Sequence, residues 1–307
     1  MISLEKLFKA GVHFGHQKRR WCPRMAPYIW GYKNNVHLID ISKTAIQLEK
    51  AAKFIEEKVG QGASVLWVGT KKPAQDIVKS VAVDLDMPYV NHRWIGGTLS
   101  NFAQVKKSAT KFLHYKDVIE KADKYPHYTK KELNVVQKAA VRLEHNVGGI
   151  LNLKWPVGVL VIVDVLKERS ALREAASMGI PVIALVDTNA DPSLVDFVIP
   201  TNDDSPRAIQ VILEYLEDAA KKGLEVVAQK KEQERIAREN ERAEKAALAA
   251  KEKAKRETVA AEEKTAESKP RAEKPAEKPA PAKTVKTAKP KAAEESAPKA
   301  KKEDKAD

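Results

Sequence analysis

The chain contains 307 residues, with 55 Lys or Arg against 42 Asp or Glu, so its formal net charge at pH 7 is +13. The length exceeds one average domain, and a hydrophobic content of 43% is near the globular norm, so we expect a sizeable core. The excess of positive charge favours an anionic partner such as nucleic acid. Residues 221–307 contain 25 basic and 18 acidic residues, so this tail carries about half of the excess and the body is only mildly basic.

A single cysteine, Cys22, excludes an intramolecular disulfide and any cysteine-based zinc cluster. The residues after Met1 lack the apolar stretch of a signal peptide, and no apolar run approaches the length of a membrane span. We therefore expect a soluble, cytoplasmic protein without a membrane partner.

The first elements are predicted to be a short helix and a small hairpin. Ser3 is a candidate N-cap for a helix that stops at Gly11, and residues 28–32 and 36–39 form a hairpin that turns at Asn34-Asn35. Residues 12–39, the first basic stretch, contain cations and aromatic rings but no acid. Cations can neutralise phosphates and rings can stack on bases, so RNA binding is favoured over a solvated loop above a buried Trp. The candidate RNA-binding residues here are His16, Gln17, Lys18, Arg19, Arg20, Trp21, Arg24 and Lys33.

An α/β pattern follows. An amphipathic helix is predicted from Ser42 to about residue 60, a buried strand at 65–70, a helix that Pro73 opens, and a second strand at 87–90. A strand–helix–strand order predicts a right-handed βαβ unit with parallel strands.

The most unusual segment, residues 89–102, has the sequence YVNHRWIGGTLSNF. The glycine pair allows another backbone to approach, Trp94 offers a flat ring, and no acid occurs from residue 87 to 116. Two interpretations stay open: a surface that grips RNA, or an ordinary βα loop over buried aromatic side chains. The candidate RNA-binding residues in this glycine loop (residues 91–101) are Asn91, His92, Arg93, Gly96, Gly97, Thr98 and Asn101.

Residues 104–147 are predicted to form an inserted antiparallel coiled-coil hairpin. Apolar residues recur at spacings of three and four, ending with Ala140, Leu143 and Val147, and Ile119 belongs to the seam of the first helix. A turn is expected at residues 125–128, after which Thr129 and Glu132 form a capping box. Lys106, Lys107 and Lys111 of the first helix are further RNA-binding candidates, although a solvated helix face is the simpler interpretation of each.

Buried parallel strands are predicted at residues 157–164, 180–187 and 195–200, and Pro206 opens a helix that runs towards Ala220. We therefore expect a central parallel sheet flanked by helices, a Rossmann-like or flavodoxin-like three-layer α/β fold. The predicted domain spans residues 1–225. Residues 226–307 form a charged tail, helical to about Glu257 and then disordered.

The sequence gives weaker support to a catalytic function than to RNA binding. The dinucleotide-binding glycine pattern is absent after every predicted strand, and residues 69–72 lack the full phosphate-loop motif. Asp164 and Asp187 end strands, so a nucleotide or sugar-phosphate enzyme remains the alternative function, and a protein-recruiting coiled-coil scaffold is another. His13 and His16 with Asp187, Asp203 and Asp204 would suit a divalent ion, but nothing in the sequence fixes their proximity. We assign no catalytic residue, metal or cofactor.

Several motifs in register resemble the ribosomal protein S2 family of the small subunit. They are HFGH at 13–16 with RRW at 19–21, VGTK at 68–71, YVNHRWIGGTLSNF at 89–102, IPVIALVDTN at 180–189 and NDD at 202–204. The similarity extends over residues 1–220. The inserted hairpin and, separately, the sequence of residues 187–192 resemble the bacterial or organellar branch of the family. Val165, where proline is usual, and Cys22, where asparagine is usual, depart from the family pattern.

The resemblance implies a structural, non-catalytic protein of the cytoplasmic ribosome. It implies contacts with small-subunit ribosomal RNA, a role in subunit assembly and translation, and docking of ribosomal protein S1 beside other small-subunit proteins. We expect no homo-oligomer.

Overall fold

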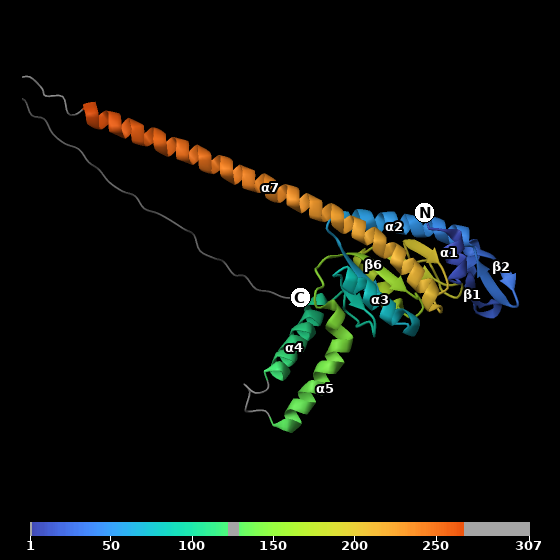
Figure 1. Ribbon diagram of the computed structural model, residues 1–307. Helices are drawn as coiled ribbons and strands as arrows, with labels where there is room; N and C mark the ends of the chain where they lie inside the picture. Colours follow the sequence, from blue (N-terminus) through green and yellow to red (C-terminus); the bar gives the residue numbers. More distant parts are fainter. Residues whose placement is uncertain (1, 122–128, 267–307) are drawn as a thin grey trace, which may run out of the picture. The chain divides into compact units, whose positions relative to one another are not determined.

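The computed structural model describes residues 2–121 and 129–266 (Figure 1). By its internal contacts the chain divides into two units, Met1–Arg242 and Ala243–Asp307. Both the α/β body and the helical hairpin lie within the first unit. Among the described residues, no helix combines the length and apolarity needed to span a bilayer.

A five-stranded parallel sheet forms the centre of the first unit. Its strands are β4 (Ser64–Val68), β5 (Tyr89–Val90), β6 (Val157–Val163), β7 (Val182–Val186) and β8 (Phe197–Pro200), in the order β5-β4-β6-β7-β8. The strands are apolar along their length because helices cover both faces of the sheet. The predicted fold class is confirmed.

Two hydrophobic clusters lie on the opposite faces. Val159, Val161 and Val163 of β6 join one cluster, whereas Leu160 and Ile162 join the other. The first cluster also contains residues of α1 (Leu4–Lys9), α2 (Ile41–Gly60), α3 (Lys72–Asp84) and α7 (Pro206–Ala266). The second contains residues of α6 (Arg169–Met178), the glycine loop and the base of the helical hairpin. The sheet and the elements that cover its two faces form the three layers of the fold.

A small antiparallel sheet carries much of the first basic stretch. Its strands are β1 (Phe14–Gln17), β2 (Ile29–Lys33) and β3 (Val36–Ile39), in the order β1-β3-β2. Asn34 and Asn35 have φ angles of 50° and 62°, the left-handed conformation that two-residue hairpin turns require, so the predicted turn is confirmed. Strand β1 was not predicted.

Helices α4 (Phe102–Glu120) and α5 (Lys130–Val147) run antiparallel in Figure 1 and contact each other along their length. The capping box of Thr129 and Glu132 is present. In α4, Val118 is 2% exposed, whereas the predicted seam residue Ile119 is only half-buried, so the seam was placed one residue too late. The predicted turn at residues 125–128 lies outside the described residues.

Two helix boundaries differ from the prediction. Helix α2 begins at Ile41, because the Asp40 side chain caps it by accepting a hydrogen bond from the Ser42 amide at 3.0 Å. Helix α7 is continuous to Ala266. We expected one helix that ends near residue 220 and a second helix that ends near Glu257. No proline occurs between Pro206 and Pro270, and the tail is rich in strong helix formers. The predicted disorder beyond residue 266 lies outside the described residues.

Candidate nucleic-acid interface

The first basic stretch presents a run of exposed cations. Lys18–Arg20 form a short 3₁₀ turn directly after β1, and all three side chains are exposed, as are Gln17 and Lys33. Lys18, Arg19 and Arg20 form no ion pair with any residue that the structure describes. The Lys18 ammonium lies 4.4 Å from the centre of the Tyr32 ring. Exposed cations without an acidic partner are available to neutralise phosphates.

Two other residues of the stretch are engaged with the protein. The Arg24 guanidinium donates to the carboxylate of Asp191 and, at 2.7 Å, to the hydroxyl of Ser193, a contact that sequence spacing could not reveal. Hydrogen bonding from Ser193 and the nearby Arg24 hold the pKa of Asp191 below its usual range. Trp21 is 37% exposed and lies 5.3 Å from the His37 ring, so one part of it packs on the protein while another faces solvent.

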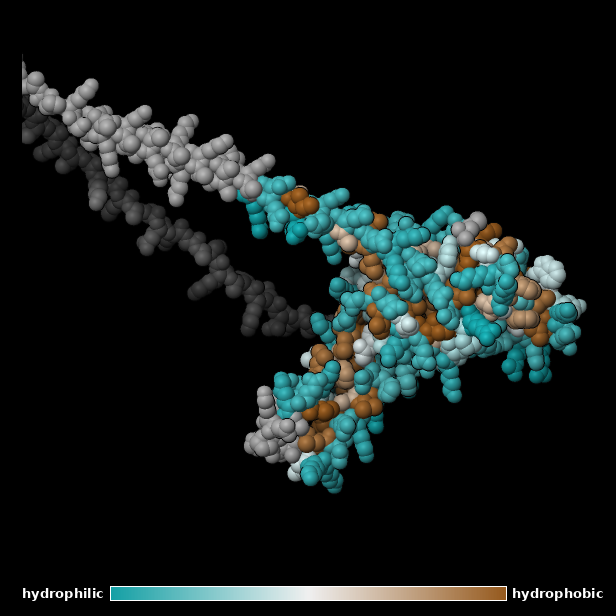
Figure 2. Space-filling view, viewed as in Figure 1, coloured by the Kyte–Doolittle hydropathy of each residue, from teal (hydrophilic) through white to brown (hydrophobic). Residues whose placement is uncertain are grey.

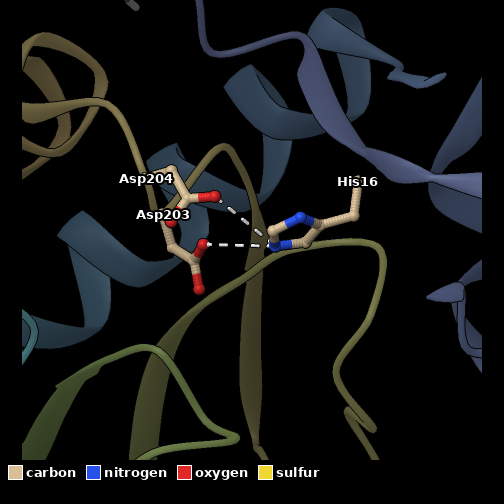
Figure 3. Close-up of side chains that lie close together, drawn as sticks. All are labelled: His16, Asp203 and Asp204. Carbon is tan, nitrogen blue, oxygen red and sulfur yellow. Dashed lines mark ion pairs between the residues drawn. The ribbon is translucent and has the colours of Figure 1, made fainter.

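His16 faces a cluster of acidic side chains, and its predicted RNA contact stays a prediction. Its amide donates to the Thr188 hydroxyl at 2.9 Å, which fixes β1 against the loop after β7. Its Nε2 atom points towards Asp203 and Asp204, whose nearest oxygens are 3.9 and 3.7 Å away (Figure 3). The nearest oxygen of Asp187 is 3.6 Å from the same atom. This nitrogen is buried and has no hydrogen-bond partner among residues 2–121 and 129–266.

Lys71 supplies a cation to this acidic cluster. Its ammonium lies 2.8 Å from Asp203, 2.6 Å from Asp204 and 3.7 Å from Asp164. Burial alone would lower the pKa of Lys71, but its hydrogen bonds with Asp203 and Asp204 raise it. Burial, together with the charge of Asp187, raises the pKa of Asp203 to about 7. Burial also raises the pKa of Asp187.

Side chains occupy the crevice between the carboxyl ends of β4 and β6, where the strand order reverses. Thr70 donates a hydrogen bond to the carboxylate of Glu168, and the Lys167 ammonium donates to the Thr70 carbonyl at 2.8 Å. Asp164, with φ at 68°, accepts a bond from the Leu166 amide at 2.9 Å. Doubly wound enzymes bind nucleotides in this crevice. Here the polar groups after β4 and β6 bond to one another within the protein, which gives the nucleotide-enzyme alternative no support.

The cluster has the donor types of a divalent cation site, although Lys71 lies in it. Ligand atoms of His16, Asp203 and Asp204 all lie within 4.8 Å of one another. The proposed ligand His13 is elsewhere: its ring stacks on Phe8, with the centroids 4.5 Å apart, and lies tilted against Phe14, with the centroids 4.1 Å apart. Burial lowers the pKa of His13. Because Lys71 already neutralises part of the acidic charge, we assign no metal.

The glycine loop has an exposed part and a buried part. His92, Arg93, Gly96 and Asn101 are exposed, and Asn91 is half-buried. Thr98 is 1% exposed and its hydroxyl donates to the Ile95 carbonyl at 2.7 Å, so its side chain braces the loop, and its contact with RNA stays a prediction. Trp94 is 8% exposed and therefore offers no free face for stacking.

Glu174 of α6 holds this loop and was not predicted. Its carboxylate accepts hydrogen bonds from the Trp94 indole at 3.1 Å and from the Gly97 amide at 2.8 Å. It also accepts bonds from the Leu99 and Ser100 amides, at 3.0 and 3.4 Å. Residue 174 is 77 positions from Gly97, so no local pattern indicated the contact.

The three candidate lysines of the hairpin lie on its first helix. Lys106, Lys107 and Lys111 are exposed on α4. Lys106 borders a cavity of about 240 Å³ at the base of the hairpin, together with Lys154 and Phe102. The Lys111 ammonium lies 5.5 Å from the centre of the Tyr115 ring.

The first basic stretch and the glycine loop share one hydrophobic anchor. Met25 of the former and Trp94 and Leu99 of the latter belong to the same cluster, on the face of the sheet that α6 covers. Met25 is therefore anchored on the same side of the parallel sheet as the glycine loop, although they are more than sixty residues apart, whereas Val12 at the start of the first basic stretch belongs to the cluster on the other face.

A comparison with protein families identifies the chain. The model of the family described as Ribosomal protein S2 matches residues 7–223, which include the parallel sheet, the helical hairpin and both cation-bearing segments. The match extends over more than two thirds of the chain. The protein therefore belongs to the ribosomal protein S2 family and is a structural component of the small ribosomal subunit in the cytoplasm.

Proposed function

We propose that this protein binds small-subunit ribosomal RNA through the first basic stretch, the glycine loop and the lysine face of α4. The observation that carries the proposal is that Met25 of the first basic stretch and the glycine loop share one hydrophobic cluster, while both segments carry exposed cations and no acid. Lys18, Arg19 and Arg20 have the unpaired charge that phosphate binding requires. His92, Arg93 and Asn101 supply hydrogen-bonding groups beside them.

The buried glycine-loop residues have a supporting role in this proposal. Trp94, Thr98 and Leu99 hold the loop to the body, whereas the exposed Gly96 has open space where a side chain would stand. A nucleic-acid backbone can approach the loop at that point.

Protein partners complete the proposed function. Neighbouring small-subunit proteins and ribosomal protein S1 are the partners that family membership suggests, and binding them supports subunit assembly and translation. Figure 2 shows hydrophobic residues at the surface of the α4–α5 hairpin, where Leu113, Val135 and Val141 are exposed. Such residues suit contacts with other proteins. We propose that the protein acts there as a monomer without a cofactor.

The salt dependence of RNA binding tests the proposal. The affinity of the full chain for transcribed small-subunit ribosomal RNA is measured over a range of salt concentrations. Replacing Arg19 and Arg20 with Ala should lower the slope of log affinity against log salt by about two, about one for each lost phosphate contact. Replacing Lys50 and Arg207, exposed cations of α2 and α7, is the matched control and should leave the slope unchanged. Equal slopes for both double variants would reject the proposed surface.

A further inference from the structure

The carboxylate of Glu174 occupies a ring of hydrogen-bond donors in the glycine loop. Three backbone amides, those of Gly97, Leu99 and Ser100, converge on its two oxygens at 2.8–3.4 Å. The Trp94 indole adds a fourth donor. Four donors on one carboxylate from a separate helix form a defined site rather than an incidental surface contact.

The loop's conformation creates this site. Gly97 has φ of +91°, and the Asn101 amide donates to its carbonyl at 2.8 Å, so the chain turns tightly and its amides point to one side. Successive amides that point into one concavity form a nest, which binds anions. A loop beside RNA could therefore offer the nest to a phosphate, but Glu174 fills it from within the protein.

Because donors of the glycine loop are buried, they need the Glu174 carboxylate as a hydrogen-bond acceptor. Leu99 is 1% exposed and Trp94 is 8% exposed, so their donors have little access to water. Buried donors without an acceptor destabilise the conformation that buries them. The same loop carries exposed His92 and Arg93 before the nest and Asn101 after it. The conformation that Glu174 stabilises is thus the one that presents these groups to solvent.

We propose that Glu174 is a positioning residue for RNA binding: it closes the nest against phosphate and holds the glycine loop with Arg93 outward. This inference rests on the proposed RNA-binding function. An opposite role is also testable, in which Glu174 is a gate that an RNA phosphate displaces from the nest. The two roles predict opposite effects of removing the charge.

A double-mutant cycle tests the proposal on the full-length protein. Glu174→Gln keeps the side-chain size, but its amide has only one acceptor oxygen and adds two donors. We expect this variant to bind transcribed small-subunit ribosomal RNA roughly tenfold more weakly, and its salt slope to fall by about one as the Arg93 contact is lost. In an Arg93→Ala background, the same change should have almost no further effect, because both changes remove one interaction. Ser177→Ala is the matched control, since this α6 hydroxyl donates to the Glu174 carbonyl at 2.8 Å and not to the loop.

The outcomes separate this inference from the proposed function. Tighter RNA binding by Glu174→Gln, or losses that multiply with Arg93→Ala, would overturn the positioning role. If Arg93→Ala and the Arg19/Arg20 variant both bind normally, the proposed RNA surface fails, whatever Glu174 does. The Trp94 indole N–H resonance, assigned with Trp94→Phe, should move in Glu174→Gln and stay in place in Ser177→Ala. If Glu174→Gln does not fold, Trp94→Phe removes one of the four donors and should weaken binding by a smaller factor; unchanged binding would then count against the proposal.

Discussion

Replacing Lys71 with Met should destabilise the protein in a strongly pH-dependent way. Lys71 contacts Asp203 and Asp204 at 2.8 and 2.6 Å, and Asp203 is almost fully buried. Breaking a fully buried ion pair costs about 3–5 kcal/mol. Because Lys71 is 19% exposed and Asp204 is 58% exposed, we expect a loss of about 2–3 kcal/mol in the free energy of unfolding at pH 8.

The loss in the free energy of unfolding caused by Lys71→Met should be smaller at lower pH. Burial raises the pKa of Asp203 to about 7 in the folded protein, against about 3.9 in the unfolded chain. Between these values the folded state takes up a proton that the unfolded state does not, so protonation at Asp203 stabilises the fold as the pH falls from about 7 to 4. Removing Lys71 raises this pKa further, since its charge favours the ionised form. At pH 5.5 the variant should therefore lose only about 1 kcal/mol. The charged groups that shift the pKa of Asp203 are Asp187, Lys71 and Asp164, while His16 and Asp204 also lie in the cluster.

Urea denaturation of both proteins at pH 8 and pH 5.5 measures this difference. Lys53→Met is the control, because its ion pair with Glu49 at 3.1 Å is on the surface and should contribute less than about 1 kcal/mol at either pH. A Lys71→Met loss that is equal or larger at pH 5.5 would refute the account of the cluster.

Three further substitutions test the helical hairpin, two of them its packing on the body and one the start of α5. In Gly149→Ala the new Cβ would lie 2.3 Å from the Tyr89 carbonyl oxygen, so thermal and urea unfolding should show a loss of about 2–3 kcal/mol. Gly148→Ala, whose Cβ would meet only the Glu144 side chain at 3.5 Å, should be tolerated, and equal losses would contradict the packing argument. Thr129→Ala removes the capping box and should weaken the start of α5 by about 1 kcal/mol, seen as faster amide exchange in its first turn. Unchanged exchange there would show that the cap is unimportant.

The sequence predicted the elements whose signals are local. Unbroken apolar runs indicated the buried parallel strands, and the Asn34-Asn35 pair specified a turn that needs positive φ at both residues. The capping box likewise depends on residues only three positions apart. Such patterns succeed because the physical cause lies within a few residues of its effect.

The parts of the site that depend on distant residues could not be predicted. Glu174 meets a loop 77 residues away, and Arg24 meets Asp191 across 167 residues. His13 and His16 are three positions apart, one just before β1 and one on it, yet the first stacks on Phe8 and the second faces acids. Residue type suggested metal binding for both, and only the fold separates them.

Sedimentation of the tagged full-length protein from lysate tests the central claim most directly. The account predicts that wild-type protein sediments with the small ribosomal subunit and that ribonuclease releases it. A triple variant, Arg19→Ala, Arg20→Ala and Arg93→Ala, should remain mostly at the top of the gradient, whereas the Lys50→Ala and Arg207→Ala control should sediment normally. If the triple variant sediments as fully as wild-type protein, these cations do not hold it on the ribosomal RNA.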